Sequence, residues 1–160
     1  MTRSGIGYDA HPLAPDRPLI LGGVAIPYGR GLQGHSDGDV LAHAVIDALL
    51  GAAALGDIGA HFPADGPNAV PEGASSIALL ERTMALVREA GYRLENVDAT
   101  IIAQRPTLAP SLPAMRAALA RALGADEGRV NVKATTEDGL GYTGASAGIA
   151  AIAAAAIERV

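Results

Sequence analysis

The chain has no cysteine and no tryptophan, and only 3% of its 160 residues are aromatic. Without cysteine it can form neither a disulfide bond nor a thiolate-ligated zinc site. Any bound metal must therefore be held by histidine and carboxylate side chains. Because aromatic residues are few while hydrophobic residues make up 49% of the chain, we expect a core built from alanine, valine, leucine and isoleucine.

Positive charge is also scarce, since the net charge is −5 and the twelve lysines and arginines form no basic run. This argues against a general nucleic-acid binder, which needs a positive patch. The longest alanine-rich run, residues 148–157, is too short to span a bilayer, and the first residues lack the apolar core of a signal peptide. We therefore expect a cytoplasmic protein without a membrane or nucleic-acid partner, folded as one domain over residues 1–160.

The spacing of hydrophobic residues predicts a mixture of strands and helices. Strands are expected at residues 4–8, 18–21, 24–26, 97–104 and 130–136, with the second and third joined in a hairpin by Gly22-Gly23. Helices are expected at residues 38–50, from Ser75 or Ser76 to Gly91, and from Ser111 to Gly124. Helices grouped on one face of a mixed sheet would give an α+β fold.

Three stretches are less regular or ambiguous. Residues 28–34 and 63–68 are rich in turn-forming residues and predict loops, the second of them mobile. The alanines of residues 148–157 favour a helix by propensity. Their flanking glycines and their place after a strand suit a buried central strand instead.

Residues 34–62, GHSDGDVLAHAVIDALLGAAALGDIGAHF, hold three of the four histidines. Ser36 or Asp37 can cap the helix. Within it, His43 has Asp39 four residues before it and Asp47 four residues after it, so the three lie on one face. This pattern suits a metal ligand whose second ring nitrogen is held by an outer carboxylate. A polar surface stripe is the plainer alternative.

Asp9 and His11 follow the first strand and point the same way, because alternate residues of an extended chain share a face. Together with His43 they offer one carboxylate and two imidazoles, the ligand set of a catalytic zinc with an open fourth position. Three unrelated polar residues would give the same spacing. His35-Ser36, at the helix start, suits an anion such as phosphate, or is a simple cap.

Three further segments offer groups for a substrate. Residues 57–59 can bind hydroxyl groups, although Asp57 is equally suited to cap the next turn. Residues 103–109 leave a strand through a proline, which frees backbone groups. Residues 135–138 supply hydroxyls for phosphate and acids for magnesium. The last two are also compatible with ordinary loops.

The chain resembles the 2-C-methyl-D-erythritol 2,4-cyclodiphosphate synthase family from residue 5 to 157. The resemblance rests on DAH near the start, GHSDGDVLAHAVIDALLGAAALGDIGAHFP, NVDATIIAQRP and VNVKATTEDGLGYTG, in that order. It implies a homotrimer of α+β subunits around a central axis, with active sites between subunits and a strand at the C-terminal end. It also implies conversion of 4-diphosphocytidyl-2-C-methyl-D-erythritol 2-phosphate to the 2,4-cyclodiphosphate with release of CMP, in the non-mevalonate isoprenoid pathway.

By the same resemblance, Asp9, His11 and His43 would hold zinc, or manganese in its place. His35 and Thr136 would stabilise the transition state, and Asp138 or Glu137 would contact magnesium on the diphosphate. The resemblance also implies a set of substrate-binding residues: Asp9, Ala10, His11, His35, Ser36, Asp57, Ile58, Gly59, Phe62, Asp65, Ala103, Gln104, Arg105, Pro106, Thr107, Leu108, Ala109, Ala134, Thr135, Thr136 and Tyr142.

Five positions depart from the family pattern. Ala64 and Ala147 replace acids, Thr107 replaces a lysine, Ala145 replaces an arginine, and Asp138 takes the place of the magnesium-binding glutamate. Each lost charge-assisted contact is worth about 1.5–3 kcal/mol, so weaker substrate binding is expected. Two alternatives stay open: a metal-dependent phosphohydrolase of nucleoside diphosphate compounds, and a non-catalytic trimer that binds isoprenoid diphosphates.

Overall fold

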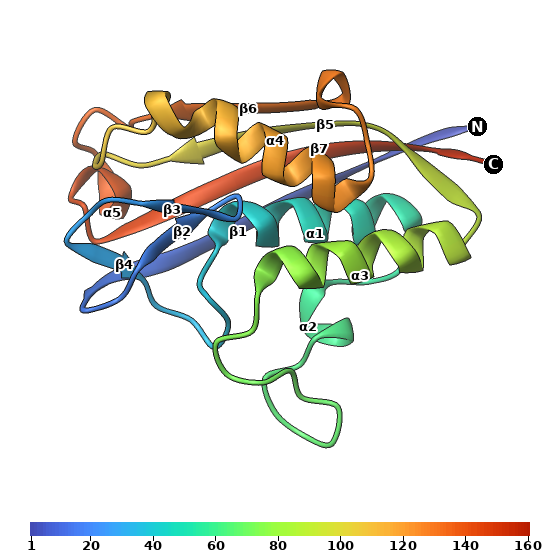
Figure 1. Cartoon of the computed structure of the whole chain (residues 1–160), viewed down its shortest axis with the longest axis horizontal. Helices are drawn as coiled ribbons and strands as arrows, with labels where there is room; N and C mark the ends of the chain where they lie inside the picture. The colour runs from blue at the N-terminus through green and yellow to red at the C-terminus, as the bar shows by residue number, and fades with distance from the viewer.

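A five-stranded sheet forms the back of the molecule and three long helices cover its front (Figure 1). The computed structural model describes residues 1–160. Every neighbouring strand pair is antiparallel except β5 and β6, so the sheet is mixed. The predicted α+β class is confirmed. In spatial order the strands are β4 (Arg30–Leu32), β1 (Thr2–Pro15), β7 (Gly148–Arg159), β5 (Tyr92–Ile102) and β6 (Val130–Thr135).

Each of the three predicted helices is present in the structure. The long ones are α1 (Val40–Ala53), α3 (Ser76–Glu89) and α4 (Leu112–Leu123), and the short ones are α2 (Ile58–His61) and α5 (Gly141–Gly144). Two 3-10 turns lie at Ala109–Ser111 (η1) and Glu127–Arg129 (η2). The predicted hairpin is formed by β2 (Leu19–Leu21) and β3 (Val24–Ile26), and both of its turn glycines have positive φ, as such a turn requires. No helix is long and apolar enough to cross a membrane.

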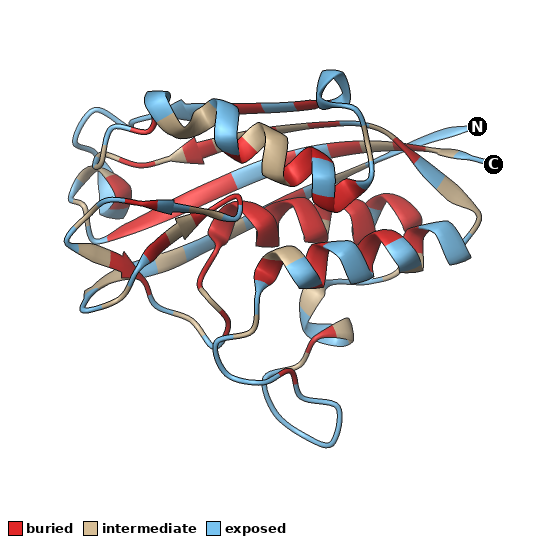
Figure 2. Ribbon diagram, viewed as in Figure 1, coloured by how far each residue is buried: buried red, intermediate tan, exposed pale blue.

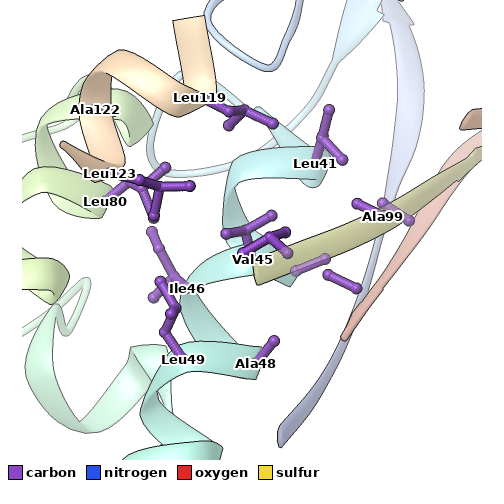
Figure 3. Packing of buried hydrophobic residues seen from close by; sticks show 14 of the residues in the cluster. Leu41, Val45, Ile46, Ala48, Leu49, Leu80, Ala99, Leu119, Ala122 and Leu123 are labelled. Carbon is purple, nitrogen blue, oxygen red and sulfur yellow. The ribbon is translucent and has the colours of Figure 1, made fainter. Parts of the chain in front are cut away.

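Helix α1 lies at the centre of the core, between the sheet and the other two long helices (Figure 3). Twelve of its fourteen residues are buried, so it is red over most of its surface in Figure 2. The core is almost wholly aliphatic, as expected, and Phe62 is its only phenylalanine. Because α1 is packed on most of its surface, the position of any functional side chain on this helix is fixed.

The packing of α1 against β1 depends on two glycines. A Cβ atom at Gly7 would lie 1.9 Å from the carbonyl oxygen of Ala44, and one at Gly5 would lie 2.1 Å from that of Ala48. No side chain fits there, so the helix rests on the bare backbone of the strand. This contact sets the distance between the residues that β1 and α1 bring to the site.

Residues 148–157 lie in strand β7, as the resemblance implies and against alanine propensity, because β7 pairs with β1 on one side and β5 on the other. Three predictions of local structure need correction. Arg30–Leu32, predicted as loop, pairs with the end of β1. Asp39, and not Ser36 or Asp37, caps α1. Ser111 precedes α4 without making a side-chain cap.

Candidate metal centre and substrate hollows

Asp9, His11 and His43 converge on one point beneath the sheet. His11 Nε2 lies 2.7 Å from Asp9 Oδ2, His43 Nδ1 lies 2.9 Å from the same oxygen, and the two ring nitrogens are 3.2 Å apart. Strand β1 supplies two of the ligands on its inner face, and α1 supplies the third. The structure therefore brings together the three residues that the sequence predicts as metal ligands.

The outer nitrogen of each imidazole is held by a protein acceptor. His11 Nδ1 donates to the carbonyl of Gln33 at 2.7 Å, and His43 Nε2 lies 2.9 Å from Ser76 Oγ. Because the Ser76 hydroxyl donates in turn to Asp37, its oxygen is the acceptor for His43. Each outer nitrogen thus keeps a proton, so each inner nitrogen can give up the proton that it shares with Asp9 and offer its lone pair to a metal ion.

These residues fit a divalent metal ion. A tetrahedral ion bound at about 2.0–2.1 Å needs ligand atoms roughly 3.3 Å apart, slightly more than the observed spacing. Burial raises the pKa of Asp9, but hydrogen bonds from His11 and His43 outweigh it and lower that pKa to about 2. The hydrogen bond to Asp9 raises the pKa of His11. The carboxylate is therefore ionised and available as a ligand at neutral pH.

The expected role of Asp39 and Asp47 as outer carboxylates is wrong. Asp39 is fully buried and accepts the backbone N–H groups of Gly22, Gly23 and Ala42, so it ties α1 to the hairpin. Asp47 accepts the N–H of Ile58 at 2.8 Å and fixes the start of α2. The acceptor that holds the outer nitrogen of His43 is Ser76, whose hydroxyl donates to Asp37.

A hollow of about 220 Å3 opens over the metal ligands. His35 and Ser36 lie on one side of it and the α2 segment on the other. His35 Nε2 donates to the carbonyl of Val70 at 2.7 Å, which leaves Nδ1 for a ligand. Its full lining is Asp9, His11, His35, Ser36, His43, Ile58, Gly59, Phe62, Ala64, Val70 and Leu79.

A second hollow, of about 210 Å3, lies where β5 and β6 end. Parallel strands bring their carboxyl ends to one edge, and here they place the 103–109 loop beside Thr136. The lining consists of Ala103, Gln104, Pro106, Thr107, Leu108, Ala109, Ala134, Thr135 and Thr136. Most of the predicted substrate residues therefore fall into two separate hollows of one chain, with no lining residue in common.

Several predicted substrate residues line neither hollow. Asp57 caps α2 at the edge of the metal hollow, where its carboxylate accepts the N–H of Ala60. Asp65 lies on the exposed 63–68 loop, and Arg105 is exposed beside the second hollow. Ala10 and Tyr142 line a third hollow at the end of β1, where Tyr142 contacts Tyr8 through their hydroxyl groups.

The two candidate magnesium ligands are arranged differently. Glu137 accepts a hydrogen bond from the buried hydroxyl of Thr143. Asp138 has a positive φ of 53° and pairs weakly with Thr136, 3.3 Å away. Asp138 therefore lies next to the residue that lines the second hollow, whereas Glu137 faces α5.

Sequence reasoning missed the supports of the metal ligands. Ser76, considered only as a helix cap, contacts His43 across 33 residues of sequence. The carbonyls of Gln33 and Val70 orient His11 and His35. Every residue has a backbone carbonyl, so the sequence does not show which carbonyl accepts a hydrogen bond from a histidine. The Asp37 pairing with Ser76 could have been suspected only from knowing that α1 and α3 begin side by side.

The fold and the site together define a class of protein: an α+β domain in which one carboxylate and two imidazoles converge as candidate metal ligands at the edge of a hollow. The chain belongs to the YgbB family, whose model matches residues 2–158. The resemblance noted in the sequence is thereby confirmed.

Curated relatives named 2-C-methyl-D-erythritol 2,4-cyclodiphosphate synthase match nearly the whole chain. The protein of Clostridium perfringens is 58% identical over 147 residues, which are 92% of this chain and 93% of that protein. That of Geobacter metallireducens is 59% identical over 157 residues, 98% of this chain and 99% of that protein.

Solved structures give the same result. The bifunctional IspDF from Campylobacter jejuni superposes with a TM-score of 0.94 at 42% identity, and this chain covers 43% of that longer chain. A CDP complex of IspF from Plasmodium falciparum has a TM-score of 0.85 at 30% identity, with 99% of this chain and 96% of that one covered. A CDP-bound 2C-methyl-D-erythritol-2,4-cyclodiphosphate synthase scores 0.88 at 36% identity, with 98% and 100% covered.

Proposed function

We propose that this chain, as a single domain over residues 1–160, converts 4-diphosphocytidyl-2-C-methyl-D-erythritol 2-phosphate to 2-C-methyl-D-erythritol 2,4-cyclodiphosphate and releases CMP. The observation that carries this proposal is the convergence of Asp9, His11 and His43 at a hollow of about 220 Å3, in a chain of the YgbB family. The reaction belongs to isoprenoid precursor synthesis. A cytoplasmic location stays a prediction of the sequence.

The synthase function is favoured over both alternatives. Relatives at 58–59% identity carry the synthase name over nearly their whole length. The substrate's own 2-phosphate is the nucleophile in the cyclisation, so the protein has to position and neutralise charge but needs no nucleophile of its own.

The residues of the metal hollow have distinct roles in this proposal. Asp9, His11 and His43 would hold a divalent ion, with zinc favoured by the ligand set and manganese next. Such an ion supplies Lewis-acid stabilisation of charge on a phosphate oxygen. His35, anchored at Nε2 by Val70, presents Nδ1 to the phosphate and donates a hydrogen bond when protonated. Ile58 and Gly59 form the opposite wall, where the erythritol lies.

The second hollow would take the cytidine and diphosphate. Backbone groups of the 103–109 loop are available to the base, and Thr136 is placed to donate to a phosphate oxygen. Asp138, beside Thr136, is our choice over Glu137 for the magnesium that accompanies the diphosphate. Tyr142, which lines neither hollow, is proposed to contact either the substrate or the axis of the trimer.

We propose that the two hollows complete each other across a subunit interface in a homotrimer. The sheet face opposite the helices carries exposed apolar side chains on neighbouring strands, among them Ile6, Tyr8 and Ile152. Exposed apolar surface of this kind favours association of subunits. Small alanines on β7 would let three sheets approach closely, and the metal hollow of one subunit would then meet the second hollow of its neighbour.

Mixed trimers test this assembly. His43→Ala removes a metal ligand and Thr136→Val removes the hydroxyl of the second hollow, so each variant alone should release little CMP. In an equimolar mixture refolded together, about a quarter of the sites should combine two intact halves and recover activity. A mixture that stays inactive, with trimers formed and metal bound at half of the sites, would contradict a shared site.

A further inference from the structure

A hollow of about 510 Å3, larger than either substrate hollow, lies between the C-terminal ends of α3 and α4 and the start of β5. Buried apolar side chains, among them Met84, Leu94 and Leu123, lie beneath it, and its rim is polar. It shares no lining residue with either substrate hollow. Four arginines from four different elements surround it: Arg88, Arg93, Arg121 and Arg129.

Two of these arginines already have carboxylate partners. Arg93 pairs with Glu158, and Arg129 Nη1 lies 3.6 Å from Glu95 and donates to its backbone carbonyl at 3.0 Å. These pairs hold one wall of the hollow in place. Their charge is largely compensated before any ligand arrives.

The other two arginines have uncompensated charge. Arg88 donates to the carbonyl of Leu123 at 3.1 Å and has no carboxylate partner, and the side chain of Arg121 forms neither a hydrogen bond nor an ion pair. Asp126 is the single carboxylate on the lining, and it pairs with no cation. Two of the four guanidinium groups therefore have no carboxylate partner, beside one carboxylate that has no cation partner, in a chain whose net charge is −5.

The repulsion of an anion by the last turn of α4 is weakened, because three of the last four carbonyls of the helix already have donors. Gly124 and Ala125 donate their N–H groups to Arg121 and Ala120, and Arg88 covers the carbonyl of Leu123. A Cβ at Gly124 would lie 2.7 Å from Arg88 Nη2. The absence of a side chain at Gly124 thus lets the guanidinium of Arg88 lie over the turn and reach the hollow.

We propose that this hollow binds a small organic phosphate, with its apolar part on the floor and its phosphate between Arg88 and Arg121. Guanidinium groups bind phosphate through paired hydrogen bonds, and the volume is within the range of small-molecule sites. The ends of α3 and α4 that form it point toward the chain termini, whereas the metal ligand His43 is in the first turn of α1 (Figure 1). The site is additional to the proposed synthase site and does not depend on it.

Octyl phosphate, inorganic phosphate and octanol are the probes for this proposal, titrated against the whole protein. Amide NMR signals of Gly124 and Ala125 report on the hollow, and those of Gly34 and Gly59 report on the metal site. Octyl phosphate should shift the first pair and bind at least about tenfold more tightly than inorganic phosphate, because only it uses the apolar floor. Octanol should bind weakly, since it carries no charge.

Two variants that each remove one positive charge distinguish binding at this hollow from general electrostatic attraction to the protein. Arg121→Gln should weaken octyl phosphate binding about tenfold or more. Arg116→Gln, on the same helix but outside the hollow, should leave it unchanged. Arg88→Gln provides a second test, with its melting temperature checked because Arg88 also covers a helix carbonyl.

Three results would overturn the proposal. The first is the absence of shifts at Gly124 and Ala125 when octyl phosphate saturates. The second is equal weakening in Arg121→Gln and Arg116→Gln, which would indicate general charge attraction. The third is inorganic phosphate binding as tightly as octyl phosphate, which would contradict the apolar part of the site.

Discussion

At the scale of single residues, the metal centre is prepared by the groups behind its ligands. The carbonyl of Gln33 and the hydroxyl of Ser76 fix which nitrogen of each imidazole carries the proton. Without them the neutral rings of His11 and His43 could keep their single proton on the nitrogen that faces Asp9. Orientation of this kind matters because a metal ion binds only the unprotonated nitrogen.

Ser76→Ala tests this role of the outer hydroxyl, and the neighbouring Ser75→Ala is its control. Loss of the Ser76 hydroxyl leaves His43 Nε2 with Ser36 alone, at 3.1 Å, so we expect metal affinity to fall about tenfold. Ser75 caps α3 by accepting the N–H of Ala78, so its loss should cost about 1 kcal/mol of stability and leave metal affinity unchanged. Zinc titration and urea unfolding of both variants measure the difference. Equal metal affinity in the two would refute the role of Ser76.

The ligands could be predicted from the sequence, but their supports could not. Asp9 and His11 follow from the two-residue period of a strand, and His43 follows from its place on an amphipathic helix. Ser76 is brought to His43 only by the packing of α3 on α1. The assignment of Asp39 as an outer acid failed because burial and three backbone donors hold it at the hairpin.

At the scale of elements, the α1–β1 contact decides the geometry of the site. The strand supplies Asp9 and His11 and the helix supplies His43, and their backbones touch at Gly5 and Gly7. The ambiguity of residues 148–157 between helix and strand is resolved at this scale too. Alanine propensity favours a helix, yet the small side chains of β7 pack flat beneath α1 while β1 and β5 satisfy the backbone on both sides.

Gly7→Ala should force strand β1 away from helix α1. Its new methyl group would meet the carbonyl oxygen of Ala44 at 1.9 Å, so we expect a loss of about 3 kcal/mol or more of unfolding free energy. Gly51→Ala is the matched control, because its nearest neighbour is 3.9 Å away on the exposed side of α1. That change should stabilise the helix by up to about 1 kcal/mol. Urea unfolding distinguishes the two, and a Gly7→Ala protein as stable as the parent would contradict the close contact.

Strand β6 is joined to β5 by an exposed ion pair with a measurable signature. The hydrogen bond from Lys133 to Asp98, 2.6 Å long, lowers the pKa of Asp98 below its ordinary value of 3.8. Since the ionised form is favoured in the folded chain, this pair adds stability above pH 3.8 and loses it as the pH falls through the lowered pKa. The effect is small because both groups are exposed.

Lys133→Met should therefore raise the pKa of Asp98 toward 3.8, as measured by carbon NMR of its carboxyl group. Asn131, which also donates to Asp98, stays in place and keeps part of the shift. Lys133→Arg should retain most of the depression. An unchanged pKa in Lys133→Met would mean that Lys133 does not pair with Asp98 in solution.

At the scale of the whole molecule, the proposed trimer explains two features that one chain leaves incomplete. The substrate residues are divided between two hollows, and the sheet face opposite the helices presents Ile6, Tyr8 and Ile152 to solvent. The sequence pattern cannot give either feature, because alternation along a strand predicts two faces without saying what covers the second.

Ile152→Glu should break the trimer. In the proposed assembly this side chain is buried between subunits, so three carboxylates would meet near the axis. Each subunit would lose the about 1.5–3 kcal/mol gained by burying isoleucine, and burying the carboxylates would cost more in addition. We expect sedimentation to give the mass of one chain, and CMP release to fall with it. Val160→Glu, at the exposed end of the chain, should leave both unchanged. A trimeric, fully active Ile152→Glu protein would refute this interface.

The central claim is tested most directly by a phosphorus NMR time course. The purified protein is incubated with 4-diphosphocytidyl-2-C-methyl-D-erythritol 2-phosphate, zinc and magnesium, beside a chelator-treated sample. Our account predicts that CMP and a cyclic diphosphate appear together and only when metal is present, despite Thr107 and Ala145. Linear phosphate products would indicate a hydrolase, and an unchanged substrate spectrum with metal bound and the trimer intact would contradict the synthase function.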